Sequence, residues 1–183
     1  MQQNNQNIIR MRKRLFLLLL AFISLCQMNA VERTKLNFNG GWLLKVGDFP
    51  GAEQANYKDA GWKQITLPRA FNEKEAFKVS IEHLSDTITW YRKHFHIQEV
   101  GDRKYFIEFE GVRFGADIWL NGKKVGYTEN GVMASGFDLT PYIIKGENVI
   151  AVRVDNSWNY RERTSGQRFQ WNDKNFNANY GGI

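Results

Sequence analysis

The chain has 183 residues, a formal net charge of +6 and 14% aromatic residues. With 43% hydrophobic residues and three prolines, it has the composition of a globular domain, which excludes a disordered chain. A single cysteine excludes a fold held together by disulfide bonds.

The first 30 residues have the form of a secretory signal peptide. An apolar run over residues 15–26 contains Ser24 as its one polar residue. Four basic residues precede this run: Arg10, Arg12, Lys13 and Arg14. A basic segment before a short apolar run is typical of export signals, and a bilayer span needs about 20 apolar residues. We therefore expect residues 1–30 to be a signal peptide, residues 31–183 to be the exported domain, and no segment to span a membrane.

The cleavage point and the final location are less sharply defined by the sequence. Ala30 suits the last position before a cleavage site, although Met28 is larger than the residue expected two places earlier. Cys26 at the end of the apolar run is an alternative, because a bacterial lipoprotein would carry its lipid anchor there. Leu25 before it is bulkier than a lipobox residue. The pattern favours a soluble periplasmic or extracellular protein over a lipid-anchored one.

Most of the net charge belongs to the signal peptide. Without its four basic residues the formal charge falls from +6 to +2. The remaining basic residues form no cluster that interleaves with the aromatic residues, so the sequence predicts no nucleic-acid partner.

The first half of the domain contains short strands separated by turns. Residues 36–38 and 42–44 suggest opening strands around the Gly40-Gly41 turn. Residues 49–60 are polar and small, which predicts a loop, and residues 62–67 form a short strand that Pro68 ends. Two further segments follow: residues 71–86, ambiguous between a helical turn and a long loop, and residues 90–97, an alternating strand.

The second half, residues 105–156, predicts four strands in quick succession. They begin near Tyr105, Ala116, Phe137 and Asn148. Asn121-Gly122 is a dipeptide that tolerates the positive φ angles of a tight hairpin. In the last strand Ile150, Val152 and Val154 share one face, and Asp155 lies on the other. Short alternating strands without a βαβ rhythm predict an all-β fold, an antiparallel jelly-roll-like β-sandwich.

Several stretches, in this order and spacing, resemble the N-terminal sugar-binding domain of glycoside hydrolase family 2. They are residues 90–95 (WYRKHF), 109–112 (FEGV), 118–123 (IWLNGK), 138–140 (DLT), 148–156 (NVIAVRVDN) and 180–183 (YGGI). Residues 156–158 (NSW) and 176–180 (FNANY) look most like those of β-galactosidase-type members. The resemblance implies a galactose-binding-domain-like fold from about Leu36 onward.

The resemblance also implies what other domains would supply. In such enzymes an immunoglobulin-like domain and a (β/α)₈ barrel follow, and the barrel carries the two catalytic glutamates of retaining hydrolysis. Neither domain follows within these 183 residues. We therefore expect an N-terminal fragment, a sandwich incomplete at its C-terminal edge that packs on those domains, and no catalytic residue or cofactor. The parent enzyme would hydrolyse terminal β-galactosides or related β-glycosides, and this chain alone would be inactive.

Asp155 is the first candidate for a functional residue, and two interpretations of it remain open. Asp at a strand end commonly caps a turn through its own side chain. In β-galactosidase-type relatives, the resemblance implies, an Asp at this place points into the active site of the barrel and accepts a hydrogen bond from a sugar hydroxyl. A carboxylate suits that role because charge-assisted hydrogen bonds are strong.

Asn156, Asn175 and Asn177 are weaker candidates for sugar contacts. An amide offers both a donor and an acceptor to a hydroxyl group, but Asn is also common in loops of this composition. Trp158 and Trp171 flank the same loop. Either could stack on a pyranose, although packing is the commoner use of Trp, and packing is the interpretation that we favour.

No catalytic or metal-binding pattern accompanies these residues. His94 and His96 share a strand face and His83 stands apart, so we expect exposed histidines and no metal site. Glu108 and Glu110 alternate outward with Lys104 on one strand, which indicates a solvated face and no acid/base pair.

Three functions remain open at this stage. The first is the accessory sugar-binding domain of a family 2 enzyme, with a β-galactoside or related glycan as its ligand. The second is a stand-alone carbohydrate-binding module, which would need an exposed aromatic platform. The third is a truncation product without a function, which would be marginally stable because of an open strand edge.

Overall fold

The computed structural model describes residues 10–16, 33–71, 87–131, 133–157, 159–168 and 181–183. The chain divides into two units, Met1–Leu36 and Asn37–Ile183. The first contains a short helix over residues 10–16. No helix in the described ranges has the length and apolar character that crossing a membrane requires.

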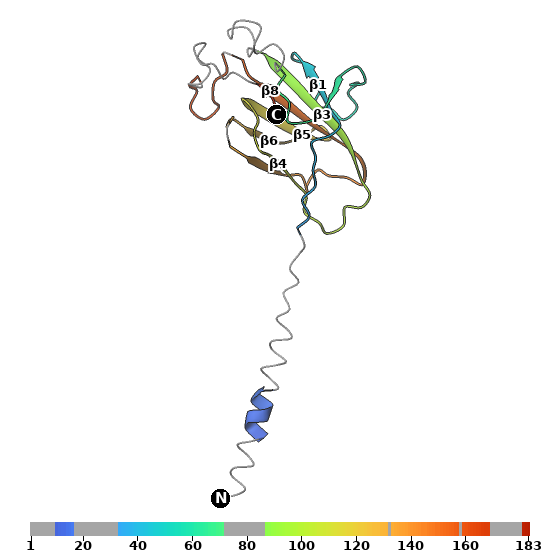
Figure 1. Ribbon diagram of the computed structural model, residues 1–183, viewed down its shortest axis with the longest axis vertical. Coiled ribbons are helices and arrows are strands. Elements are labelled where there is room, and N and C mark those ends of the chain that lie inside the picture. Colours follow the sequence, from blue (N-terminus) through green and yellow to red (C-terminus); the bar gives the residue numbers. More distant parts are fainter. Residues whose placement is uncertain (1–9, 17–32, 72–86, 132, 158, 169–180) are drawn as a thin grey trace, which may run out of the picture. The chain divides into compact units, whose positions relative to one another are not determined.

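The second unit is an antiparallel β-sandwich, as the sequence predicted. Its larger sheet has six strands in the order β2-β1-β3-β8-β5-β6, and its smaller sheet pairs β4 with β7 (Figure 1). The strands are β1 (Trp42–Val46), β2 (Lys63–Ile65), β3 (Ile88–Ile97), β4 (Phe106–Phe109), β5 (Gly115–Leu120), β6 (Lys123–Thr128), β7 (Ser135–Asp138) and β8 (Gly146–Asp155). All of their pairings are antiparallel.

The main core lies between the two sheets. Ile150, Val152 and Val154 of β8 have no exposed surface, and they pack in one cluster with Ile107 and Phe109 of β4. Burial of such a side chain contributes about 1.5–3 kcal/mol, so this face holds the sandwich together. The alternation read from the sequence therefore assigned the inner face of β8 correctly.

Part of the outer face of the six-stranded sheet is covered by the loop over residues 48–62. Ala52 and Trp62 of this loop form a second cluster with Trp90 and Ala151, and Trp90 stacks on Trp119 with ring centroids 5.5 Å apart. The segment is a loop, as predicted, but it packs as a lid over apolar and charged side chains. Its polar composition did not indicate that role.

Two predictions about individual strands were wrong. Residues 36–38 form no strand. The structure has five strands between residues 105 and 156, whereas the sequence predicted four. The strand that the prediction missed is β6. The alternation of β6 is broken where its pairing with β5 shifts register at Ile118 and Trp119. The Asn121-Gly122 hairpin between β5 and β6 is confirmed, with φ angles of 53° and 78°. The segment over residues 72–86 lies outside the described residues.

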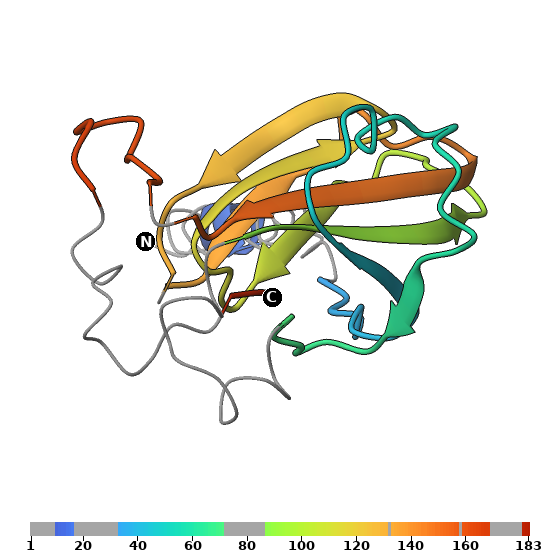
Figure 2. The same cartoon turned by 90° about the horizontal axis from the view of Figure 1, so that it is seen from above.

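The last three residues form backbone hydrogen bonds and bridges with two segments, one near Ala70 and one at Arg113. Gly182 forms antiparallel bridges with Ala70 and with Arg113, and Ile183 accepts a hydrogen bond from the backbone N of Arg69 at 2.7 Å. Figure 2 shows this short red segment next to the green end of the loop that follows β2. The chain end therefore lies between two parts of the sandwich.

Candidate functional site

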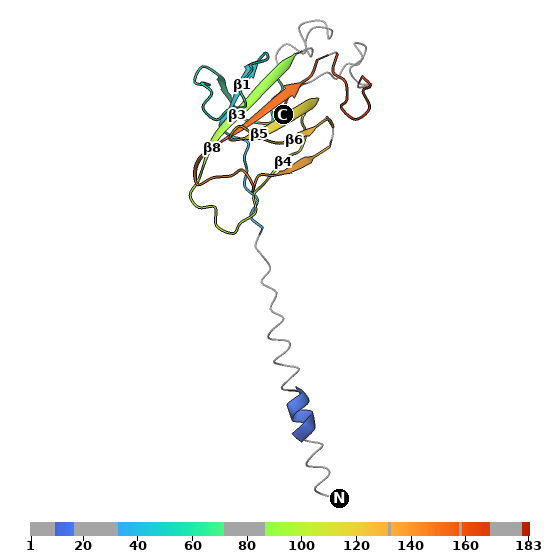
Figure 3. The same ribbon diagram turned by 180° about the vertical axis from the view of Figure 1, so that it is seen from behind.

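Asp155 is the last residue of β8, which lies between β3 and β5 in the six-stranded sheet (Figure 3). Its register partners are Ile88 on β3 and Gly115 on β5. Val154 points into the core, so Asp155 faces outward, as the sequence predicted. The carboxyl group therefore lies at the end of an inner strand of the sheet.

Local hydrogen bonds orient the Asp155 carboxylate. Oδ1 accepts a hydrogen bond from the backbone N of Ser157 at 3.0 Å and from Ser157 Oγ at 2.6 Å. This is the turn-capping geometry that the sequence offered as one interpretation. Oδ2 has one contact among the described residues, with Arg153 Nη1 at 3.4 Å. The Asp155 side chain is partly exposed, at 19%.

Arg153 links Asp155 to the loop over the sheet. Its Nε and Nη2 donate to Oδ1 and Oδ2 of Asp48 at 3.0 and 2.7 Å, and Trp90 Nε1 donates to Asp48 Oδ1 at 3.1 Å. The hydrogen bond from Arg153 lowers the pKa of Asp48, and that carboxylate raises the pKa of Arg153 in return. Arg153 therefore stays protonated between two carboxylates.

Asn156 is buried, with 1% of its surface exposed. Its backbone N donates to Thr87 O at 3.0 Å, and a Cβ on Gly181 would lie 3.0 Å from its Nδ2. In the described structure its amide therefore packs between the end of β8 and the chain end. Asn175 and Asn177, and likewise Trp158 and Trp171, lie outside the described residues.

A second polar cluster next to Asp155 was not predicted. Its members come from β5, from the ends of β6 and from the segment after β8: Asp117, Lys124, Glu129, Tyr160 and Arg163. Arg163 donates to both carboxylate oxygens of Asp117 at 2.8 and 2.6 Å, and Lys124 Nζ lies 2.7 Å from Asp117 Oδ1. Burial opposes ionisation of Asp117, but these bonds outweigh it and lower its pKa.

The same cluster places Tyr160 beside the register partner of Asp155. Its hydroxyl donates to Glu129 Oε1, and its ring occupies the space where a Cβ on Gly115 would lie. Burial raises the pKa of the Tyr160 hydroxyl most, and the hydrogen bond with the Glu129 carboxylate raises it further. The outward position of Asp117 on β5 was a usable signal, but nothing in the sequence connects it with Arg163, 46 residues later.

The described part of the site offers hydrogen-bonding groups and ion pairs. Asp48 and Asp155 share Arg153, and Asp117 is held by two cations, so neither arrangement is an acid/base pair. His94 and His96 are exposed, as expected, and His94 Nε2 lies 2.8 Å from Asp59 Oδ2. Within the described ranges no three His, Cys, Asp or Glu side chains are placed to hold a metal ion.

Comparison with known protein families gives a match over nearly the whole domain. Residues 31–181 match the family described as the glycosyl hydrolase 2 galactose-binding domain-like domain. A β-glucuronidase of Formosa agariphila is 37% identical over 163 residues, which are 83% of this chain and 16% of the relative. The β-galactosidase BoGH2A of Bacteroides ovatus is 33% identical over 133 residues, 68% of this chain and 16% of that enzyme.

Solved structures give the same result. The β-glucuronidase 2 of Bacteroides uniformis, covalently bound to cyclophellitol-6-carboxylate aziridine, superposes with a TM-score of 0.69 at 26% identity. The match covers 83% of this chain and 17% of that one. The 183 residues therefore span about a sixth of the length of these relatives and match one of their domains.

Proposed function

Since the chain belongs to glycoside hydrolase family 2 through its galactose-binding-like domain, we propose that it serves as the sugar-contacting accessory domain of such an enzyme. In this proposal Asp155 accepts a hydrogen bond from a substrate hydroxyl. The catalytic pair of carboxylic acids belongs to a barrel domain. The chain by itself would bind and position, and would not hydrolyse.

The observation that supports this role is the geometry of Asp155. Ser157 donates to Oδ1 through its backbone N and its Oγ, which orients the carboxylate, while among the described residues Oδ2 has the 3.4 Å contact with Arg153. A preorganised acceptor loses little side-chain entropy when a ligand binds. A hydrogen bond to a charged group contributes about 1.5–3 kcal/mol, enough to discriminate between sugars that differ in one hydroxyl.

The names of the relatives indicate the class of substrate. They include both β-glucuronidases and β-galactosidases. We propose that the parent enzyme removes terminal β-galactosyl or related β-glycosyl residues, β-glucuronosyl residues among them. Asn156 would act indirectly, by packing the chain end against β8. Asn175 and Asn177 remain proposed sugar contacts on the sequence argument alone.

Export of the protein is part of the same proposal. Residues 1–30 would act as the signal peptide, which places the mature domain in the periplasm or outside the cell, with a lipid anchor at Cys26 as the alternative. Mass spectrometry of the mature N-terminus from the producing cell distinguishes the two, because an anchored protein would begin with a lipidated Cys26.

A chimaeric enzyme tests the role of Asp155. Residues 31–181 replace the matching domain of the Formosa agariphila β-glucuronidase, and hydrolysis of a nitrophenyl β-glucuronide is measured. We expect an active chimaera in which Asp155→Asn lowers kcat/KM at least about tenfold, the effect of about 1.4 kcal/mol in transition-state binding.

Asp138→Asn is the matched control. Asp138 also caps a turn after a strand, accepting from Thr140 N at 2.8 Å, but it lies on β7 of the other sheet. Equal kcat/KM values for the Asp155→Asn, Asp138→Asn and unaltered chimaeras would contradict a sugar contact at Asp155.

A stand-alone carbohydrate-binding module is less well supported by the surface. Tyr127 of β6 is an aromatic residue on the outer face of the six-stranded sheet, and it is 44% exposed. The Arg163 guanidinium lies 4.6 Å from its ring centroid and covers it. The described part of the outer face therefore offers no open aromatic platform there for a sugar ring.

A further inference from the structure

The sequence contains three Asn-Gly dipeptides: Asn39-Gly40, Asn121-Gly122 and Asn130-Gly131. Asparagine before glycine is prone to spontaneous loss of its side-chain amide, because glycine has no Cβ to shield its backbone nitrogen. We propose that Asn39 is a deamidation site of the folded protein and that the tertiary structure protects Asn121. The proposal is independent of the sugar-contacting role.

The reaction needs water and no other reagent. The backbone nitrogen of Gly40 attacks Cγ of Asn39 and forms a new N–Cγ bond. The Cγ–Nδ2 bond then breaks, and Nδ2 leaves as ammonia with the proton from the Gly40 N–H. Water opens the resulting succinimide at either carbonyl carbon, which yields aspartate or isoaspartate at position 39. The side chain of residue 39 must rotate toward the following nitrogen for the first step.

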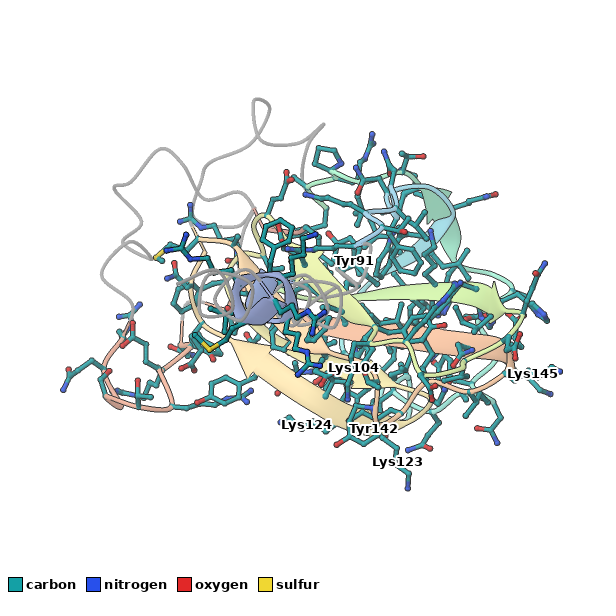
Figure 4. The ribbon with its side chains drawn as sticks, turned by 90° about the horizontal axis from the view of Figure 1, so that it is seen from below. Tyr91, Lys104, Lys123, Lys124, Tyr142 and Lys145 are labelled. Atoms are coloured by element: carbon teal, nitrogen blue, oxygen red, sulfur yellow. The ribbon has the colours of Figure 1, made fainter. Side chains whose placement is uncertain are left out.

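Asn121 cannot make that rotation without losing three hydrogen bonds. Its Nδ2 donates to Tyr142 O at 3.0 Å and to Asn148 Oδ1 at 2.9 Å, and its Oδ1 accepts from Val149 N at 2.9 Å. Asn148 has no exposed surface, so its Oδ1 would keep only the hydrogen bond from Ile144 N at 3.0 Å, and water could not replace the bond that is lost. Figure 4 labels Tyr142, and it also labels Lys123 and Lys124, which follow the Asn121-Gly122 turn.

Asn39 has the opposite surroundings. It is exposed, and among the hydrogen bonds of the described residues only its backbone takes part, with Asn37 Oδ1 and with Leu67 N. A Cβ built on Gly40 meets no atom within 4 Å. Both the carboxamide of Asn39 and the space around the attacking nitrogen are therefore open.

Asn130 lies between these two cases. Like Asn39 it is exposed, and its backbone N donates to a nearby side chain, Thr128 Oγ1, at 3.4 Å. A Cβ on Gly131 would lie 3.3 Å from Arg113 Cγ and 3.5 Å from Phe114. The neighbouring side chains thus restrict the Asn130-Gly131 backbone more than that of Asn39-Gly40. The structure orders the three sites as Asn39 first, Asn130 second and Asn121 last.

Isoaspartate at position 39 would loosen the segment before β1. It adds one methylene group to the main chain between residues 39 and 40. Leu67 N donates to Asn39 O at 2.9 Å, and Lys93 Nζ donates to Gly40 O. The longer main chain displaces both acceptors, so modification is expected to lower the melting temperature.

Peptide mapping by mass spectrometry tests the proposal on the full chain, incubated in mildly alkaline buffer. We expect Asn39 to convert at least about 100-fold faster than Asn121, because the three hydrogen bonds of Asn121 must break before its side chain can rotate. In urea the three sites should convert at similar rates, because the protection of Asn121 requires the fold.

Gly40→Ala is the matched variant. Its new Cβ meets no neighbour, so the fold is retained while the nitrogen of residue 40 becomes shielded. We expect the conversion of Asn39 to slow at least about tenfold in this variant, with the rate at Asn130 unchanged. Conversion of Asn121 in the folded chain as fast as that of Asn39, or an unchanged rate at Asn39 in Gly40→Ala, would overturn the proposal.

Discussion

Arg92 on β3 is fully buried, and its Nε donates to Asp59 Oδ2 at 2.7 Å. Its Nη1 donates to the main-chain O atoms of Ala52 and Gln54 as well. One guanidinium group thus joins the outer face of the six-stranded sheet to three points of the loop over residues 48–62. The loop is held over the sheet by a charge that burial alone would disfavour.

Replacement of Asp59 by Ala is therefore expected to destabilise the domain strongly. The variant leaves the Arg92 charge buried without its partner, which costs about 3–5 kcal/mol. Urea denaturation followed by tryptophan fluorescence measures the change in the free energy of unfolding. Arg161→Ala is the control, because Arg161 is exposed and donates to the nearby Gly166 O. A loss below 1 kcal/mol for Asp59→Ala would contradict the role of the pair.

Gly182→Ala is expected to detach the last residues of the chain. Gly182 has a φ of 142°, and a Cβ there would lie 2.6 Å from Arg69 O and from the hydroxyl oxygen of Tyr91. Backbone strain of this kind costs about 1–3 kcal/mol. Hydrogen exchange should show faster exchange of the amides of Arg113 and Phe71, which donate to residues 182 and 181. Gly40→Ala, which meets no neighbour, should leave both rates unchanged.

Acid is expected to unfold the domain through its paired aspartates. Burial opposes ionisation of Asp59 and Asp117, but hydrogen bonds from Arg92 and Arg163 outweigh it, so both pKa values lie below the ordinary 3.8. A carboxyl with a lowered folded-state pKa contributes stability above its ordinary pKa, and this contribution is lost as the pH falls through the folded value.

Urea titrations at several pH values measure this effect. The free energy of unfolding should change little between about pH 7 and 5 and fall below about pH 4. Asp117→Asn should be less stable at neutral pH and should show a shallower acid dependence. The same acid slope in Asp117→Asn as in the unaltered protein would show that this carboxyl does not contribute.

Purified residues 31–183 are expected to show no glycosidase activity. The described carboxylates near Asp155 are held by Arg153, Arg163 and Lys124, and none forms the pair that retaining hydrolysis requires. Incubation with nitrophenyl β-galactoside and β-glucuronide, monitored for release of nitrophenol, measures this. Turnover that Asp155→Ala abolishes would refute the prediction.

The sequence was most informative where a residue's environment follows from its own strand. Alternation in residues 148–156 identified the inner face of β8, and Asn121-Gly122 identified a hairpin, because side-chain direction and turn geometry depend on adjacent residues. It was less informative for β6, where a register shift interrupts the alternation. Residues 36–38 alternate without becoming a strand, because an edge segment must also find a partner.

The candidate site divides in the same way. Asp155 was identified from its position at the end of an alternating strand, and both its outward direction and its turn-capping bonds are local. Asp48 lies 105 residues away from Arg153, and Asp117 lies 46 residues away from Arg163. No local pattern joins either pair, so the charge cluster around Asp155 could not be anticipated.

The sequence by itself determined the antiparallel sandwich and the outward placement of Asp155, since these depend on periodicity and on short-range order. The family followed from the resemblance of several stretches to those of glycoside hydrolase family 2. Only the tertiary structure decided that a polar loop covers part of the outer face through Arg92 and that Arg153 bridges Asp48 and Asp155. It alone separated a protected Asn121 from an open Asn39. These features depend on which distant side chains meet, and such contacts form when strands far apart in the chain pair within one sheet.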